Sequence, residues 1–231
     1  MRKKKFLQED FYMKRALISR DAPRPDFHDP VKTTDRFARL LEKNGFETVK
    51  FDTFDCFEDL EYIKQFDLVV YSWTMSDEWA KGIDNLRCAV RDFGVGLAGC
   101  HGGLCDSLRY NDQWQYMTGG QWVAHPGNDS VRYTVNITDR HSAITEGIND
   151  FELISEQYYM HVDPGVDVLA TTTFPDNASG KTVVVPAAWT KYFGKGRVFY
   201  LSVGHTDDVF DRAPDAERFM EKGMLWAARA L

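Results

Sequence analysis

The 231-residue sequence has few cysteines, no long apolar run and no excess of positive charge. Its four cysteines include no C-x-x-C pair and no disulfide-rich spacing, so we expect a reducing, cytoplasmic compartment. The formal net charge of −7 gives no electrostatic support to a nucleic-acid partner. No apolar stretch approaches the length of a membrane span, about 20 residues, so we also expect no membrane partner.

The amino-terminal residues lack the pattern of a signal peptide. The basic cluster from Arg2 to Lys5 is followed by Leu7-Gln8-Glu9-Asp10 instead of an apolar run, and Met13 directly precedes the first strand-like segment. We therefore expect residues 1–12 to be a flexible extension and residues 13–231 to form a single domain. A hydrophobic fraction of 43% is enough to fill the core of one domain of this length.

The first two-thirds of the chain alternates strand-like and helix-like segments, which is typical of a parallel sheet with covering helices. The predicted strands are 15–19, 46–51, 67–72 and 95–99, and the predicted helices are 31–44, 58–65 and 76–93. Asp29 and Pro30 supply an N-cap and a first-turn proline for the first helix, and Ser76 can cap the third. Ligands of such sheets bind beside the carboxyl ends of the strands, so the turn after residue 99 is the expected site.

From about residue 130 the pattern changes towards β structure. The predicted strands there are 131–137, 166–173, 182–189 and 198–203, with a hairpin turn at Phe193-Gly194-Lys195-Gly196. A final helix begins near Pro214. The fold class is therefore α/β, with a mostly parallel central sheet, helices on both faces and an added C-terminal β region.

Four of the six histidines lie in loops beside glycine, proline or acidic residues, namely His28, His101, His125 and His205. A single loop histidine is most often a surface or capping residue, but loops that follow strands of one sheet converge, so these four could face one pocket. Imidazoles near carboxylates can transfer protons or bind a metal such as zinc. The available carboxylates are Asp29, Glu156, Asp207 and Asp208. Because no recognised zinc signature is present, both chemistries stay open.

The glycine-rich turn from Gly99 to Gly103 follows a small-residue strand and precedes a helix, as a nucleophile elbow does. One register makes Cys100 the nucleophile, although Ala98 then replaces the first glycine. The other register keeps both glycines and places His101 at the elbow, so we favour it. Cys100 is then expected to be a small, buried apolar side chain.

Aromatic residues accompany these loops and could line a pocket beside them. For Trp189, which lies inside a predicted strand, we expect a packing role. For Trp114, Trp122 and Tyr158, a pocket role and a packing role are equally supported.

Several motifs occur in order along the chain: Gly94 to Gly103, Gly119-Gly120 with His125-Pro126, His141 to Ile148, Glu156 to Tyr159, Pro186 to Trp189, and Gly194 to His205. Together with Phe27-His28-Asp29 they resemble the ThuA-like (trehalose utilisation) family from about Met13 to the C-terminus. This resemblance implies a fold similar to class I glutamine amidotransferases, a flavodoxin-like three-layer sandwich. It also implies a role in disaccharide catabolism, trehalose in particular, beside dehydrogenases that make 3-keto sugars.

The sequence departs from its relatives at several positions. A histidine stands at the elbow, and His205-Thr206-Asp207 replaces the His-x-Glu pair of amidotransferases, which argues against glutamine hydrolysis. Within the family pattern, Ser142 replaces a proline and Ser155 an acidic residue, although Glu156 is kept.

The first hypothesis is a hydrolase, lyase or isomerase that acts on a sugar or keto-disaccharide by histidine acid–base or metal-assisted chemistry. The predicted catalytic residues are His101, His205, Glu156 and Asp207, with Asp207 orienting His205. The predicted substrate-binding residues are His28, His125, Trp122, Tyr158, Gly102 and Gly103. The candidate ligands for a divalent metal such as zinc are His28, His101, His125 and His205. The expected partner is a small carbohydrate, and a homo-oligomer is left open.

The second hypothesis is a non-catalytic carbohydrate-binding or regulatory module on an amidotransferase-like scaffold. Four loop histidines that converge favour the enzyme, and four that are scattered favour the module. A third hypothesis, a cysteine hydrolase, requires a reactive thiol at Cys100.

Overall fold

The computed structural model describes residues 13–22, 28–76, 80–175 and 180–231. Nine strands form one sheet, and five of them pair in parallel in the order β2 (Glu47–Phe51), β1 (Arg15–Arg20), β3 (Leu68–Ser72), β4 (Gly96–Cys100) and β11 (Gly196–Leu201). The sheet continues through antiparallel neighbours β10 (Val183–Phe193), β9 (Asp167–Phe174), β6 (Val131–Ile137) and β7 (Phe151–Ser155). A separate antiparallel pair consists of β5 (Gly120–Ala124) and β8 (Tyr159–Val162).

The parallel strands have the order of a flavodoxin-like sheet. If β11 is counted as the fifth parallel strand, the order is 2-1-3-4-5, which places a topological switch point between β1 and β3. Ligands of open α/β sheets bind at the carboxyl ends of strands beside such a point. The central strands β3 and β4 are buried along almost their whole length, as their continuous apolar or small residues predicted.

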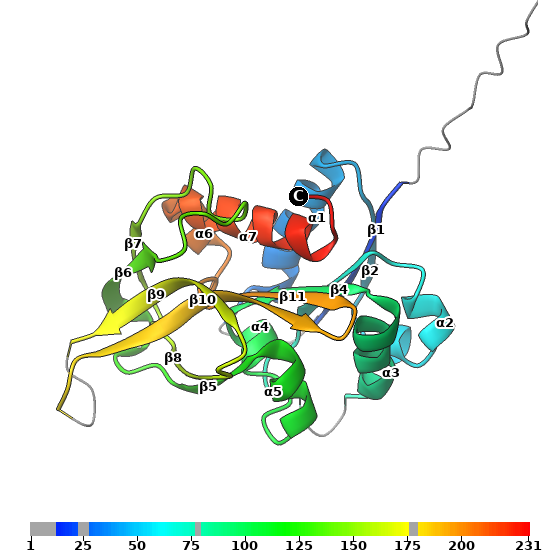
Figure 1. Cartoon of the computed structure of the whole chain (residues 1–231), viewed down its shortest axis with the longest axis horizontal. Helices are drawn as coiled ribbons and strands as arrows, with labels where there is room; N and C mark the ends of the chain where they lie inside the picture. Colours follow the sequence, from blue (N-terminus) through cyan, green and yellow to red (C-terminus); the bar gives the residue numbers. More distant parts are fainter. Residues whose placement is uncertain (1–12, 23–27, 77–79, 176–179) are drawn as a thin grey trace, which may run out of the picture.

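Helices cover both faces of the sheet (Figure 1). One face carries α1 (Pro30–Lys43), α6 (Asp208–Arg212) and α7 (Pro214–Ala227). The other carries α2 (Leu60–Ile63), α3 (Ile83–Cys88) with the π-helical turn η2 (Ala89–Phe93), α4 (His101–Cys105) and α5 (Asp112–Thr118), together with the short turn η1 (Phe54–Phe57). A further short turn, η3 (Asn128–Ser130), precedes β6. The predicted flavodoxin-like sandwich is confirmed.

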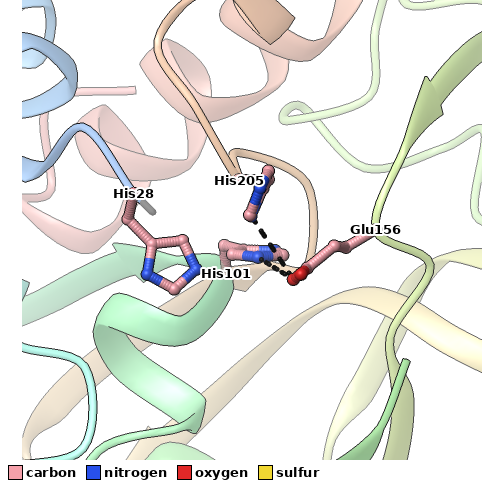
Figure 2. A group of neighbouring side chains, drawn as sticks. All are labelled: His28, His101, Glu156 and His205. Carbon is pink, nitrogen blue, oxygen red and sulfur yellow. Dashed lines mark hydrogen bonds and ion pairs between the residues drawn. The ribbon is translucent and has the colours of Figure 1, made fainter. Parts of the chain in front are cut away.

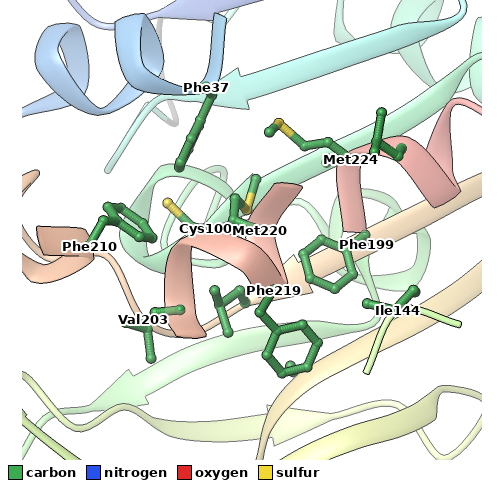
Figure 3. Close-up of a cluster of buried hydrophobic side chains, with 14 of the residues drawn as sticks. Phe37, Cys100, Ile144, Phe199, Val203, Phe210, Phe219, Met220 and Met224 are labelled. Atoms are coloured by element: carbon green, nitrogen blue, oxygen red, sulfur yellow. The ribbon is translucent and has the colours of Figure 1, made fainter. Parts of the chain in front are cut away.

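Two apolar clusters hold these layers together, one on each face of the sheet. In the first, α7 packs so closely on β11 that a Cβ atom on Gly223 would lie 2.2 Å from the ring of Phe199. Cys100 belongs to this cluster, among Phe210, Val203 and Met220 (Figure 3). The layer beneath α7 is therefore apolar, and the strand ends beyond it are where polar side chains can gather.

The structure differs from the sequence prediction at two helix starts and in three added strands. Of the predicted helix 76–93, residues 77–79 lie outside the described residues, Ser76 is buried against Ser107 and Tyr71, and the described helix α3 begins at Ile83, after Gly82 in a left-handed conformation. The strands β5, β7 and β8 were not predicted. Asp29 does stand at the N-cap position of α1, but its side chain pairs with Lys32 and makes no capping hydrogen bond.

The predicted extension at residues 1–12 lies outside the described residues. Among the helices in the described ranges, none is both long and apolar enough to cross a lipid bilayer.

Candidate active site

Three imidazoles and one carboxylate meet beyond the ends of the parallel strands (Figure 2). His28 lies in the loop between β1 and α1, His101 directly follows β4, and His205 lies in the loop after β11. Glu156 directly follows β7, in the segment that leads to β8. The ligand atoms of these four residues all lie within 4.8 Å of one another. Loops that are distant in sequence therefore converge, as predicted for His28, His101 and His205.

The turn at His101 has the geometry of an elbow. His101 has a φ angle of +48°, which is uncommon for a residue with a Cβ atom and turns the chain sharply from β4 into α4. This is the register that keeps both glycines. Cys100 is buried in the apolar cluster under α7, so the prediction of a small, buried side chain is confirmed, and burial raises the pKa of its thiol to about 12.

Gly102 and Gly103 are required by packing around the elbow. A Cβ atom on Gly102 would lie 3.0 Å from the hydroxyl oxygen of Tyr158, and one on Gly103 would lie 2.9 Å from Ser72 Oγ. Both glycines are buried, and Gly103 lines a small cavity beside His28 and His101. Packing accounts for both glycines, and their predicted substrate-binding role stays a prediction.

His101 is buried and held on three sides. Its Nδ1 lies 2.8 Å from the carbonyl oxygen of Ser202, and its Nε2 lies 3.0 Å from Glu156 Oε2. The ring of Tyr158 stacks on it with a centroid separation of 3.8 Å. Burial lowers the pKa of His101, outweighing the opposite effect of Glu156.

Glu156 is the centre of the group. In addition to His101, its Oε2 lies 3.4 Å from His205 Nδ1, and its Oε1 lies 3.0 Å from His125 Nδ1. These two contacts have ion-pair distances but not the angles of hydrogen bonds. Burial by itself would raise the pKa of Glu156, but the surrounding imidazoles hold it well below its usual range. The carboxylate is therefore ionised.

His28 completes the group from the other side. Its ring meets those of His101 and His205 edge-on, with centroid separations of 5.2 and 5.0 Å. Burial, followed by the neighbouring imidazoles, lowers the pKa of His28 to about 3. Neutral imidazole is the form in which histidine binds metals. His125 was also a candidate ligand, but the compact group contains Glu156 in its place.

The comparisons with known proteins agree with this fold. The family model for trehalose utilisation, ThuA, matches residues 15–227. The chain belongs to the ThuA family. A search of curated proteins gave no match.

Solved structures of ThuA-like proteins have the same fold. One from Bacteroides uniformis is 18% identical, with a TM-score of 0.72, over 93% of this chain and 91% of that one. One from Parabacteroides merdae is 16% identical, with a TM-score of 0.72, over 94% and 90%. A cytoplasmic protein from Salmonella typhimurium is 12% identical, with a TM-score of 0.65, over 94% and 98%. At these identities the likeness concerns the fold alone.

A cavity of about 440 Å³ opens beside the histidines of this ThuA-family chain. Its walls include His125, Trp122 and Tyr158, which the sequence predicted, and Arg109, which it did not. The Arg109 guanidinium lies 4.6 Å from the centre of a Trp122 ring and donates two hydrogen bonds to Asp106. The spacing of Asp106 and Arg109, three residues apart just beyond the elbow helix, is the signal that could have identified this pair.

The aromatic residues divide between the pocket and the core. Trp114 and Trp189 are fully buried, so Trp189 packs as predicted and Trp114 does as well. Trp122 is partly exposed and lines the cavity, and Tyr158 is buried with its ring against His101.

Asp207 differs from the prediction. Both of its carboxylate oxygens accept hydrogen bonds from Arg36 in α1, at 2.8 and 3.0 Å. None of the hydrogen bonds in the described part of the chain joins Asp207 to His205. Asp207 therefore holds the loop of His205 through Arg36 instead of orienting the imidazole directly.

Proposed function

We propose that this chain is an enzyme that acts on a sugar or keto-disaccharide at a divalent metal held by His28, His101, His205 and Glu156. The observation that carries the proposal is the convergence of their ligand atoms within 4.8 Å from four separate segments of the chain. Membership of the trehalose-utilisation family supports a role in carbohydrate metabolism.

The tautomer of His101 favours a cation at this position. A carbonyl oxygen can only accept, so Nδ1 donates its proton to Ser202, and Nε2 of the neutral ring presents a lone pair. That lone pair faces a carboxylate oxygen of Glu156 at 3.0 Å. The arrangement is repulsive unless a proton or a metal ion lies between the two atoms.

A metal ion suits the site better than protons do. His205 and His125 also bring ring nitrogens to 3.4 and 3.0 Å from the same carboxylate, and these contacts lack the angles of hydrogen bonds, so protons alone do not account for them. A divalent ion would satisfy several lone pairs together. Ligand atoms around a tetrahedral zinc lie about 3.3 Å apart, close to the 3.0 and 3.4 Å from Glu156 to His101 and His205.

When bound, such an ion would supply Lewis-acid polarisation of a substrate oxygen. The chain's own residues would supply orientation and proton transfer. The side chain of His125 is 30% exposed at the pocket, with Nδ1 3.0 Å from Glu156 Oε1, so we assign it the transfer of protons between substrate and solvent. The ring of Tyr158 excludes water from one face of His101.

The neighbouring cavity supports a small, hydroxyl-rich substrate. Its volume of about 440 Å³ lies in the range of small-molecule sites. Trp122 and Tyr158 offer apolar surface to the C–H faces of a sugar, and Asn128 and Asp129 offer polar groups that can bind its hydroxyls.

The proposal is tested by metal analysis and turnover together. Protein purified without an affinity tag should contain about one divalent ion per chain, and removing it with a chelator should abolish turnover of 3-keto-disaccharides until zinc is returned. His101→Ala should lose both the metal and the turnover, whereas His141→Ala, at an exposed histidine, should keep both. Full turnover by metal-free protein would contradict the metal and support histidine acid–base chemistry. Full turnover by His101→Ala would contradict the central role of His101.

The two rival hypotheses have less support. A non-catalytic module predicts scattered histidines, and the observed convergence favours the enzyme. A cysteine hydrolase needs a reactive thiol, and Cys100 is buried in the apolar layer under α7 with a raised pKa.

A further inference from the structure

One arginine next to the site contacts three carboxylates. The guanidinium of Arg36 donates to Asp207 through Nε and Nη2, to Asp211 at 2.9 Å and to Glu217 at 2.6 Å. Its side chain is mostly buried, and the hydrogen bond from Arg36 to Asp207 raises the pKa of the guanidinium despite the opposing effect of burial. Arg36 is therefore permanently charged, and the three carboxylates hold the N–H groups of its guanidinium in fixed directions.

Arg36 connects the chain segments that carry two of the histidines, His28 and His205. Arg36 lies in α1, which begins two residues after His28, and Asp207 lies two residues after His205. The two imidazole rings themselves meet edge-on at 5.0 Å. The helix α1 thus follows the His28 loop directly. About a turn and a half further along, its Arg36 side chain binds Asp207 in the His205 loop.

The His205 loop needs such a support. Gly204 immediately precedes His205 and has a φ angle of +126°, a conformation open to glycine and strained for other residues. A Cβ atom there would also lie 2.9 Å from Cys100 Sγ. A closely packed backbone conformation that favours glycine thus precedes His205, and the Arg36–Asp207 pair anchors the chain two residues after it.

We propose that Arg36 is a positioning residue, which sets the separation of His28 and His205 by joining α1 to the loop after β11. The inference rests on the proposed function, in which both histidines are metal ligands. A lysine would keep the charge but not the two parallel hydrogen bonds, so charge and geometry can be separated experimentally.

The test compares Arg36→Gln and Arg36→Lys with wild-type protein, using Co²⁺ as the probe. Arg20→Gln is the matched control, because Arg20 is similarly buried and pairs with Asp35 and Asp52, away from the His205 loop. We expect Arg36→Gln to raise the Kd for Co²⁺ about 10- to 100-fold and to change the visible absorption spectrum of the bound ion. Arg36→Lys should recover the Tm but not the Co²⁺ affinity, and Arg20→Gln should lower the Tm without changing the spectrum.

A second measurement, made without metal, tests the positioning role of Arg36 separately from the proposed metal site. In metal-free protein labelled with ¹⁵N-histidine, Arg36→Gln should shift or broaden the ring resonances of His205, and Arg20→Gln should not. Wild-type affinity for Co²⁺ together with unmoved His205 resonances in Arg36→Gln would overturn the positioning role. Absence of Co²⁺ binding by the wild-type protein would overturn the metal proposal, and the resonances of metal-free protein would then decide the role of Arg36 alone.

Discussion

The parallel and antiparallel halves of the central sheet contribute differently to the site. Each of three parallel strands is followed by an imidazole: His28 lies in the loop after β1, His101 directly follows β4, and His205 lies in the loop after β11. The antiparallel half supplies the negative charge, because Glu156 follows β7 and returns to the ends of the parallel strands. The parallel half thus sets positions, while the antiparallel half supplies the charge that brings three imidazoles together.

The segment that carries Glu156 is anchored in the antiparallel half. Tyr133 in β6 donates a hydrogen bond to the carbonyl oxygen of Glu156 at 3.0 Å, and Gln157 donates to Thr172 in β9 at 2.7 Å. Both anchors are buried. The backbone around Glu156 is therefore held by long-range contacts, whereas the elbow at His101 is a single local turn.

The largest effect is expected from removing the negative charge of Glu156, which is what the antiparallel half contributes to the site. Glu156→Gln keeps the shape of the side chain, but we expect it to weaken zinc binding about 100-fold or more and to abolish turnover with it, because a neutral amide cannot balance the ion. Calorimetric titration with zinc measures the first effect. The control is Glu152→Gln, an exposed carboxylate on β7 paired with Arg132, which should bind zinc normally. Normal zinc binding by Glu156→Gln would show that the charge is not what the antiparallel half contributes.

A smaller effect should reveal the strain stored in the parallel half. Both His101→Val and His101→Asn remove the ligand, but asparagine tolerates a positive φ angle and a β-branched residue does not. In metal-free protein we expect the valine variant to be about 1–2 kcal/mol less stable than the asparagine variant by urea unfolding.

The same pair of substitutions at another histidine provides the control. His161 is exposed in the strand β8, where valine should be at least as stable as asparagine because strands favour β-branched residues. Equal stability of the two His101 variants would mean that the elbow is not strained, and the parallel half would then differ from the antiparallel half only in topology.

The sequence predicted the parallel half more fully than the antiparallel half. The strands β1, β3 and β4 follow apolar or small-residue runs, and the two glycines after His101 indicated the elbow, so local patterns were sufficient. β7 was missed although its five residues alternate between buried and exposed, and β8 was missed because it has only four residues, begins at Tyr159 and shows no clear alternation. The placement of Glu156 against His101 depends on contacts between residues 55 positions apart, which no local pattern encodes.

Side-chain partners were the hardest feature to predict. The sequence placed Asp207 near His205, and this proximity suggested a direct hydrogen bond. The competing partner, Arg36, lies 171 residues away and offers a charged fork that fits both carboxylate oxygens. A bidentate pair between arginine and a carboxylate is stronger than a single hydrogen bond to an imidazole, so the distant partner prevails.

The smallest effect on the site is expected from the apolar layer beneath the parallel half. Cys100 is adjacent to His101 in sequence, yet its side chain lies among Phe210, Val203 and Met220 under α7. Cys100→Ala should therefore leave zinc affinity and turnover unchanged while lowering the free energy of unfolding by about 1 kcal/mol, the usual cost of a small cavity. Zinc titration, turnover and urea unfolding of the same preparation measure the three quantities. Loss of turnover with zinc affinity retained would make the thiol part of the reaction, and the elbow would then present Cys100 instead of His101 to the substrate.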